Sequence, residues 1–182
     1  SARGITGEFL RADLQTVPLP DGSVDIVFSE GVLHHTDDTG KAIEKLARAL
    51  KVGGVFIFYV YRKKGPIREF TDDLVRAKLR GLTDKEAWDA LNSLTKLGQA
   101  LGRLKVEVEI PEDIPLLGIH KGRIDVQRLL YWHVIKMYYR EEMSIDEMNH
   151  INFDWFRPLN CHRHTVEEVQ KFSGVIPGLP YS

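Results

Sequence analysis

The chain has 182 residues, of which 43% are apolar and 28% are charged, and its formal net charge is -1. This length suits one domain of ordinary size, and the composition is that of a globular protein able to bury a core. There is no run of five or more like charges, which argues against nucleic acid or an anionic membrane as the main partner, because phosphate binding requires clustered Lys and Arg.

Cysteine content and hydropathy point to a protein of the cytoplasm. Cys161 is the single cysteine, so no internal disulfide can form and a reducing compartment is expected. The longest apolar stretch, 55–61, is far shorter than the ~20 residues that cross a bilayer, and no signal peptide is visible. The chain begins with Ser1 and 174–182 stops without a helix pattern, so we expect both ends to be cuts in a longer parent.

Three segments at the start of the chain have clear local signals. A short strand is expected at 8–14. Two prolines and an Asp-Gly pair make 17–23 a loop, because they cannot continue a helix or a central strand. The β-branched and apolar run 24–29 has the profile of a strand that is covered on both faces.

A helix and a second strand follow. The helix is expected to start at Asp38 or Thr39 and to end at Gly53-Gly54. Apolar residues at three- and four-residue steps form its predicted buried face: Ala42, Ile43, Leu46, Ala47 and Leu50. The run 55–61 is the second buried strand. Strand, helix and strand with short joints predict a βαβ unit with parallel strands.

The stretch 63–164 is predicted to be mostly helical. A helix opens at Pro66 and runs to about Arg80, and Thr83 with Glu86 has the capping-box spacing that starts another helix. The apolar members of these two helices are Ile67, Phe70, Leu74 and Leu79, then Ala87, Trp88, Leu91, Leu94, Leu97 and Leu101.

The rest of the chain contains a connector and two further helices. Two prolines and two glycines make 106–122 a connector, and an apolar stripe predicts a helix over about 124–142. Thr165 with Glu168 repeats the capping-box spacing, so a last helix is expected from there to Phe172.

Strand ends direct attention to a ligand site. In open parallel sheets, ligands bind outside the carboxyl ends of the strands. That rule selects 13–14, 29–35 and 61–62, which should lie on the same edge of the sheet. The residue pattern alone indicates a nucleotide-like or other small ligand at this edge.

Four sequence blocks, found at 12–29, 31–36, 47–54 and 153–165, together resemble the class I S-adenosylmethionine-dependent methyltransferases of the type 11 kind. The run 12–29 resembles the family's acidic residue, Leu-Pro-Phe-Pro-like loop and Phe-Asp-like strand, and 31–36 resembles the element after its fourth strand. The run 47–54 resembles its Arg-Val-Leu-Lys-Pro-Gly-Gly segment, with valine replacing proline. The stretch 153–158, followed by 162–165, resembles a block seen late in many of these enzymes.

The resemblance implies an α/β fold: a Rossmann-like parallel sheet, here incomplete, with a large, mostly helical insertion. Residues 1–62 would be the carboxyl-terminal part of the cofactor-binding core, and 63–164 would be the insertion that forms a lid and substrate pocket. Residues 165–182 would be a returning core helix and a truncated tail.

A site for S-adenosyl-L-methionine is implied as well. Asp13 matches the acidic residue that hydrogen-bonds the adenine amino group, a role that suits a carboxylate because it accepts hydrogen bonds. Leu14 would offer its backbone N–H to the adenine ring. The residues after the next strand match positions beside the methionine part of the cofactor: Ser29, Glu30, Gly31, Val32 and Leu33. As an alternative, Asp13 caps the turn that follows it.

Histidines are the candidates for catalysis. His34 and His35 would lie near the sulfonium or the substrate and are the first candidates for a general base, and His162 is the second. Packing is the alternative for the first two. The cluster 161–164 lacks the ligand spacings of structural zinc, so no metal is expected.

Two departures from the family pattern are evident. The glycine-rich loop after the family's first strand and the acidic residue that holds the ribose are absent. The family's first two strands lie between its third and fourth, so the strand at 8–14 would have no neighbour. We expect the chain by itself to expose sheet edges and to be prone to self-association.

The resulting hypothesis is methyl transfer from S-adenosylmethionine to a small or medium-sized acceptor, an activity of the full-length parent. The main alternative is a non-catalytic, methyltransferase-like partner module. A nicotinamide-dependent oxidoreductase lacks support, because no Tyr/Lys pair for hydride transfer is evident. A metal hydrolase built on the histidines is a third alternative, which metal chelation would test.

Overall fold

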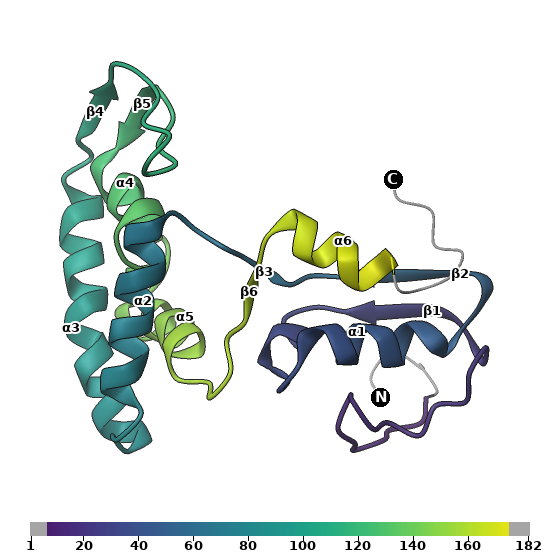
Figure 1. Ribbon diagram of the computed structural model, residues 1–182. Coiled ribbons are helices and arrows are strands. Elements are labelled where there is room, and N and C mark those ends of the chain that lie inside the picture. Colours follow the sequence, from purple (N-terminus) through teal and green to yellow (C-terminus); the bar gives the residue numbers. More distant parts are fainter. Residues whose placement is uncertain (1–6, 175–182) are drawn as a thin grey trace. The chain divides into compact units, whose positions relative to one another are not determined.

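The computed structural model describes residues 7–174 of the chain. They divide into two compact units (Figure 1). Unit 1 contains the described residues up to Arg62 and from His162 onward, and unit 2 contains Lys63–Cys161. Each unit has its own secondary structure and its own buried side chains.

Unit 1 is built on two parallel strands joined by a helix. β1 (Val24–Ser29) pairs in parallel with β2 (Leu50–Phe58). Between them lie the short 3-10 helix η1 (Leu33–His35) and the helix α1 (Thr39–Arg48). The predicted βαβ unit and the α/β fold class are confirmed.

Helix α1 has the predicted start and the predicted buried face. Asp38 is its N-cap, and the carboxylate accepts a hydrogen bond from the backbone N–H of Lys41 at 3.0 Å. Ala42 and Ile43 on its apolar face are fully buried. The residues that pack with them come from the loop, the sheet and the last helix: Val17, Leu33, Val27, Phe56, Phe58 and Phe172.

The role predicted for the glycine pair was wrong. Helix α1 ends at Arg48, and Gly53 and Gly54 lie inside β2, where the register with β1 is irregular. Gly53 has a φ of 81°, and a Cβ on Gly54 would lie 3.0 Å from the carbonyl oxygen of Asp25. Glycines are needed here because the strand bulges and passes close to its neighbour.

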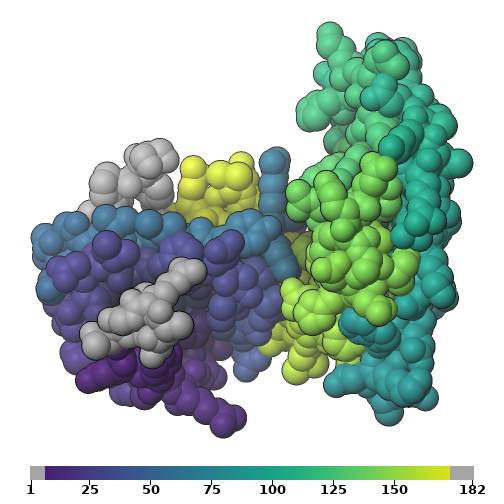
Figure 2. All heavy atoms as spheres, turned by 180° about the vertical axis from the view of Figure 1, so that it is seen from behind, coloured from purple at the N-terminus to yellow at the C-terminus, as the bar shows by residue number. Residues whose placement is uncertain are grey.

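The sheet is covered on one face, whereas two covered faces were predicted. Helix α1 packs on the side of Val27 and Phe56. The opposite face carries apolar side chains that are half or more exposed: Ile26, Phe28, Val55, Ile57 and Tyr59. Figure 2 shows atoms of β2, in blue, at the surface of unit 1. The two strands are mostly apolar, but within residues 7–174 the second face of the sheet lacks a covering layer.

The strand predicted at 8–14 is not formed. This segment has no regular structure, and a turn follows at 14–16. Phe9 and Leu10 are exposed. The physical reason is a missing neighbour, as the family resemblance leads us to expect. In the described part of the chain no strand lies beside this segment to complete its backbone hydrogen bonds.

The end of the chain returns to unit 1. β6 (Arg163–His164) pairs in parallel with β3 (Tyr61–Arg62), a pairing that the sequence did not predict. Helix α6 (Val166–Gly174) follows, and its start has both capping contacts expected from sequence. The backbone N–H of Glu168 donates to Oγ1 of Thr165 at 3.2 Å, and the reverse contact measures 2.9 Å.

Unit 2 contains the two helices predicted at its start. α2 (Pro66–Leu79) opens with proline, and α3 (Asp84–Arg103) has the complete capping box of Thr83 and Glu86. Of the apolar members named on α2, Leu79 is buried, whereas Ile67, Phe70 and Leu74 are 40%, 69% and 44% exposed. On α3, Ala87 and Leu91 are buried as predicted, but Leu97 is half exposed.

The buried face of α2 is polar. Arg68 and Asp72 are each 1% exposed and form an ion pair at 2.7 Å between Nε and Oδ2. The indole N–H of Trp155 donates to the same carboxylate oxygen at 2.9 Å. Arg76, one turn further on, is also buried. These groups can be buried because they satisfy one another.

Two predictions for the second half of unit 2 were wrong. The connector 106–122 contains β4 (Glu107–Ile110), which pairs antiparallel with β5 (Gly122–Asp125). The helix predicted over 124–142 is shorter, since α4 (Val126–His133) ends early and the chain is irregular up to 144.

Side chains hold this irregular stretch in place of helical hydrogen bonds. Asp72 accepts from the backbone N–H of Lys136 at 3.2 Å, and the amide of Gln127 donates to the carbonyl of Met137 at 2.7 Å. Asn152 accepts from the backbone N–H of Tyr138 at 2.9 Å. Asn152 belongs to α5 (Ile145–Phe156), which starts with a capping box of its own at Ser144 and Glu147.

Candidate functional site

Two adjoining hollows in unit 1 bring together the segments selected from the sequence. The first, of about 260 Å³, is lined by Asp13, Leu14, Gln15, Val32, His35, Thr36 and Asp37. The second, of about 540 Å³, is lined by Leu14, Val27, Phe28, Ser29, Glu30, Val32 and Leu46. Leu14 and Val32 line both, so the 13–14 segment and the residues after β1 border one continuous surface.

Asp13 takes part in a local turn and also faces the first hollow. Its Oδ1 accepts a hydrogen bond from the backbone N–H of Gln15 at 2.8 Å, and its carbonyl accepts from the N–H of Thr16 at 3.1 Å. Both contacts are those of the turn-capping alternative. The turn uses Oδ1, and Oδ2 makes no hydrogen bond to residues 7–174, which leaves one carboxylate oxygen available to a ligand.

The residues after β1 divide into lining and supporting positions. Ser29, Glu30 and Val32 line the second hollow, and the carbonyl of Ser29 accepts from the backbone N–H of Tyr59 at 3.0 Å. Gly31 has a φ of 71°, which turns the chain at the end of the strand. Leu33 is fully buried in the core and anchors the segment from behind.

The three histidines predicted for catalysis come together although His162 is distant in sequence. The rings of His34 and His35 lie 4.3 Å apart between centroids, and the backbone N–H of His162 donates to the carbonyl of His34 at 2.9 Å. Of the three, His35 lines the first hollow. Tyr61 stacks on His34 at 3.6 Å and meets the edge of His35 at 5.7 Å.

Burial sets the protonation of His34. Its side chain is fully buried, and neither ring nitrogen has a hydrogen-bond partner among the described residues. Burial, followed by the charge of His35, lowers the pKa of His34 from 6.5 to about 4; the Tyr59 backbone opposes this lowering, and His164 and His162 add to it. His34 is therefore neutral near pH 7 and contributes packing, whereas His35 can reach a ligand.

Comparison with known proteins shows similarity to methyltransferases. A family model described as a methyltransferase domain matches residues 2–58. The chain is 26% identical to a malonyl-[acyl-carrier protein] O-methyltransferase of Methylococcus capsulatus over 92% of this chain and 54% of that protein. It is 35% identical to the Yersinia pestis protein of the same name, over 30% of this chain and 20% of that protein. Residues 2–58 thus resemble a methyltransferase domain, and the chain is similar to methyltransferases.

Two further matches cover short parts of the chain. A dimethylglycine N-methyltransferase of Parasynechococcus marenigrum is 38% identical over 26% of this chain and 17% of that protein. The YcgJ protein from Bacillus subtilis, a solved structure, is 34% identical, with a TM-score of 0.31 over 35% of this chain and 29% of that chain. The chain thus spans about half of the first relative and a smaller share of the others.

Two site features were missed from the sequence. Tyr61 lies at one of the strand ends expected to border the ligand site, but its stacking on His34 was not predicted. The stacking follows from the pairing of β3 with β6, and strands of two residues each are too short to show a periodic pattern in the sequence. His164 joins the histidine group through the same pairing. Among residues 7–174, no three His, Cys, Asp or Glu side chains are arranged to hold a metal ion, and no helix could cross a membrane.

Proposed function

We propose that the protein to which this sequence belongs transfers a methyl group from S-adenosylmethionine to a small or medium-sized acceptor, and that the two hollows of unit 1 bind the cofactor. The observation that carries the proposal is that Asp13 and Leu14 share a continuous surface with Ser29, Glu30 and Val32. These are the segments that the family resemblance assigns to the two ends of one ligand.

The residues present fit an adenosyl group and its charged tail. The Oδ2 atom of Asp13 can accept a hydrogen bond from an exocyclic amino group, and the backbone N–H of Leu14 lies beside it. The apolar side chains of Leu14 and Val32 offer walls for a flat ring. Glu30, exposed at the second hollow, suits the cationic end of the cofactor.

The protein's contribution to the chemistry is orientation. When bound, S-adenosylmethionine supplies a methyl group on a positively charged sulfur. Displacement at that carbon needs the acceptor to be aligned more than it needs acid–base help. If the acceptor carries a proton, His35 is positioned to take it, because it faces the hollow and His34 is buried behind it.

The relatives constrain the acceptor loosely. Their names include transfer to oxygen, in malonyl-[acyl-carrier protein] O-methyltransferases, and transfer to nitrogen, in dimethylglycine N-methyltransferase. We therefore propose an oxygen or nitrogen nucleophile of a small molecule or of a group on a carrier.

Calorimetry with S-adenosylhomocysteine tests the cofactor assignment. We expect binding to be weakened about tenfold by Asp13→Asn, which replaces the charged acceptor with a neutral one and keeps an oxygen for the turn. Asp21→Asn is the matched control, since Asp21 is exposed in the following loop and lines neither hollow. Equal effects of the two substitutions would reject the site.

A second candidate function is a non-catalytic partner module. The exposed apolar face of the sheet, which includes Phe28 and Ile57, favours it. Such a module would not bind S-adenosylhomocysteine, and it would self-associate or bind another protein through this face. Sedimentation velocity of the wild type and of Ile57→Ser, a substitution on this face that lines neither hollow, separates the two candidates when it is done beside the calorimetry.

A further inference from the structure

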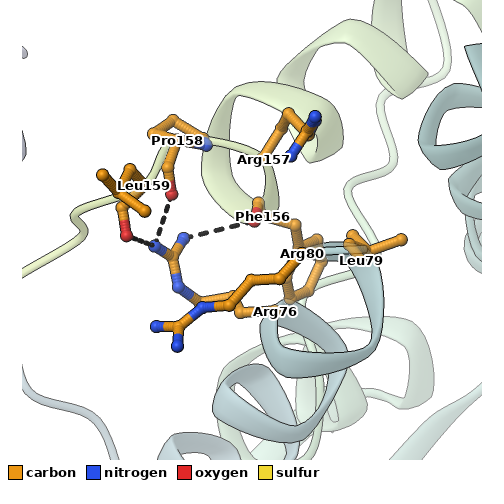
Figure 3. A pocket seen from close by; sticks show the side chains of 7 residues that line it. All are labelled: Arg76, Leu79, Arg80, Phe156, Arg157, Pro158 and Leu159. Atoms are coloured by element: carbon orange, nitrogen blue, oxygen red, sulfur yellow. Dashed lines mark hydrogen bonds between the residues drawn. The ribbon is translucent and has the colours of Figure 1, made fainter. Parts of the chain in front are cut away.

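A hollow in unit 2 lies outside the proposed methyl-transfer site. It has a volume of about 200 Å³ and is formed by the ends of α2 and α5 and the residues after α5 (Figure 3). Its lining consists of Arg76, Leu79, Arg80, Phe156, Arg157, Pro158 and Leu159. Three of these seven residues are arginines and none is acidic, so the hollow is positively charged.

Arg76 builds the floor of the hollow. Its Nη1 donates to the carbonyl of Trp155 at 2.6 Å, and its Nη2 donates to that of Pro158 at 2.6 Å. Longer contacts reach the carbonyls of Phe156 and Leu159. Figure 3 shows the guanidinium of Arg76 turned toward these backbone oxygens. Arg76 therefore fixes the chain at the end of α5, and its donors are used within the protein.

Arg157 is also committed to protein partners. Its Nε donates to Oδ1 of Asp84 at 2.8 Å, and its Nη2 donates to the carbonyl of Leu82 at 3.2 Å. The charge of Arg157 is thus compensated by an ion pair.

Arg80 is different from the other two. It follows the last residue of α2, is exposed, and makes no hydrogen bond or ion pair with the described residues. It lies four residues after Arg76, a spacing at which like charges are neighbours and repel. An anion beside Arg80 would relieve this repulsion and use donors that the protein leaves unused.

Apolar side chains complete the hollow. Leu79 is 5% exposed and Phe156 is 2% exposed, so both are rigidly packed, whereas Leu159 is 77% exposed and forms an open rim. Such walls favour a ligand whose charged group continues into an apolar chain.

We propose that this hollow binds a carboxylate or phosphate group carried on an apolar chain, with Arg80 contacting the anion and Leu79, Phe156 and Leu159 contacting the chain. The site is independent of the methyl-transfer proposal, because every residue in it belongs to unit 2. Both head groups, the planar carboxylate and the tetrahedral phosphate, carry anionic oxygens. A guanidinium can bind either of them through two hydrogen bonds.

Nuclear magnetic resonance titration of the protein with octanoate and with octyl phosphate tests the proposal. We expect one or both to shift the resonances of Leu79 and Phe156 at millimolar concentration, and octanol to shift them far less. Arg80→Gln should weaken the binding about tenfold or more, the loss expected for a charge-assisted pair. The stronger of the two probes identifies the head group.

Arg103→Gln is the matched control. Arg103 is exposed in the last turn of α3, in the same unit, and does not line the hollow. We expect it to leave binding unchanged. The proposal is overturned if neither anion shifts these resonances, if octanol binds as well as the anions, or if the two substitutions weaken binding equally. Unchanged circular dichroism of both variants excludes misfolding as a cause.

Discussion

Replacing Lys136 by methionine should stabilise the protein at neutral pH. The Lys136 side chain is 8% exposed, and its Nζ lies 4.4 Å from the centre of the Trp155 ring. Burial, followed by the charge of Arg68, lowers the pKa of Lys136 from 10.5 to about 8, against attraction by Asp72, Asp154 and Cys161. Burial thus outweighs the attraction of the neighbouring groups, so the folded state disfavours the charged amine.

The magnitude follows from the shift in pKa. The difference between 10.5 and about 8 is about 2.5, which corresponds to roughly 3 kcal/mol of stability lost while the amine is charged. Methionine removes this cost but also loses the contact of the cation with the indole, worth about 0.5–2 kcal/mol. We therefore expect the Lys136→Met protein to be about 1–2 kcal/mol more stable at pH 7.

The sign of the pH dependence gives a second readout. Below pH 8 the amine is protonated in both the folded and the unfolded state, so the cost is fully present. Between pH 8 and 10.5 Lys136 loses its proton in the folded state but keeps it in the unfolded state. The free energy of unfolding of the wild type should therefore rise with pH by up to about 3 kcal/mol relative to that of Lys136→Met. The advantage of Lys136→Met should vanish or reverse by about pH 10.

Urea unfolding followed by far-ultraviolet circular dichroism, at pH 7 and near pH 10, measures both effects. Lys78→Met is the control, because Lys78 is exposed on α2 and its removal should change the midpoint little at either pH. The reasoning is refuted if Lys136→Met is less stable than the wild type at pH 7, or if the difference between the two does not depend on pH.

Two other substitutions test the histidine group and a helix cap. His34→Leu should make the free energy of unfolding depend less on pH below 6.5. The pKa of His34 is lowered to about 4 in the folded state, so the unfolded state takes up the proton first as the pH falls. The wild type should therefore lose about 2 kcal/mol of stability relative to the variant by about pH 4.5. Urea midpoints at pH 7 and 4.5 measure this, and parallel curves would contradict it. Thr83→Ala should cost about 1 kcal/mol in the same assay, through loss of the capping box of α3, whereas Ser93→Ala, at an exposed site inside that helix, should have almost no effect.

Local signals predicted the βαβ unit and most helix starts. Asp38, Pro66, Thr83 and Thr165 each begin a helix in the structure, because capping depends on a few residues that are adjacent in sequence. Ser144 with Glu147 carries the same signal and was overlooked.

Elements whose structure depends on distant partners were predicted poorly. The stretch 134–144 has an apolar pattern of helical period, but Asp72 and Asn152 bind its backbone from other helices. No local pattern reveals those contacts. The burial of Arg68 on α2 was not predicted for a similar reason: its guanidinium donates to the carbonyl of Tyr131, a partner far along the chain.

Part of the candidate site follows from the sequence. Asp13 and the residues after β1 were selected from strand ends and family pattern, and they border one surface. The difference between His34 and His35 could not be predicted, because adjacent residues in a 3-10 turn point apart and only packing decides which is buried.

The most direct measurement is a titration of isotopically labelled protein with S-adenosylhomocysteine, followed residue by residue in nuclear magnetic resonance spectra. Cofactor binding in unit 1 predicts shifts in both the 13–14 segment and the 29–33 segment, with one shared dissociation constant that rises about tenfold for both segments in Asp13→Asn. Saturating ligand that leaves both segments unshifted, or shifts one without the other, would contradict the proposed site.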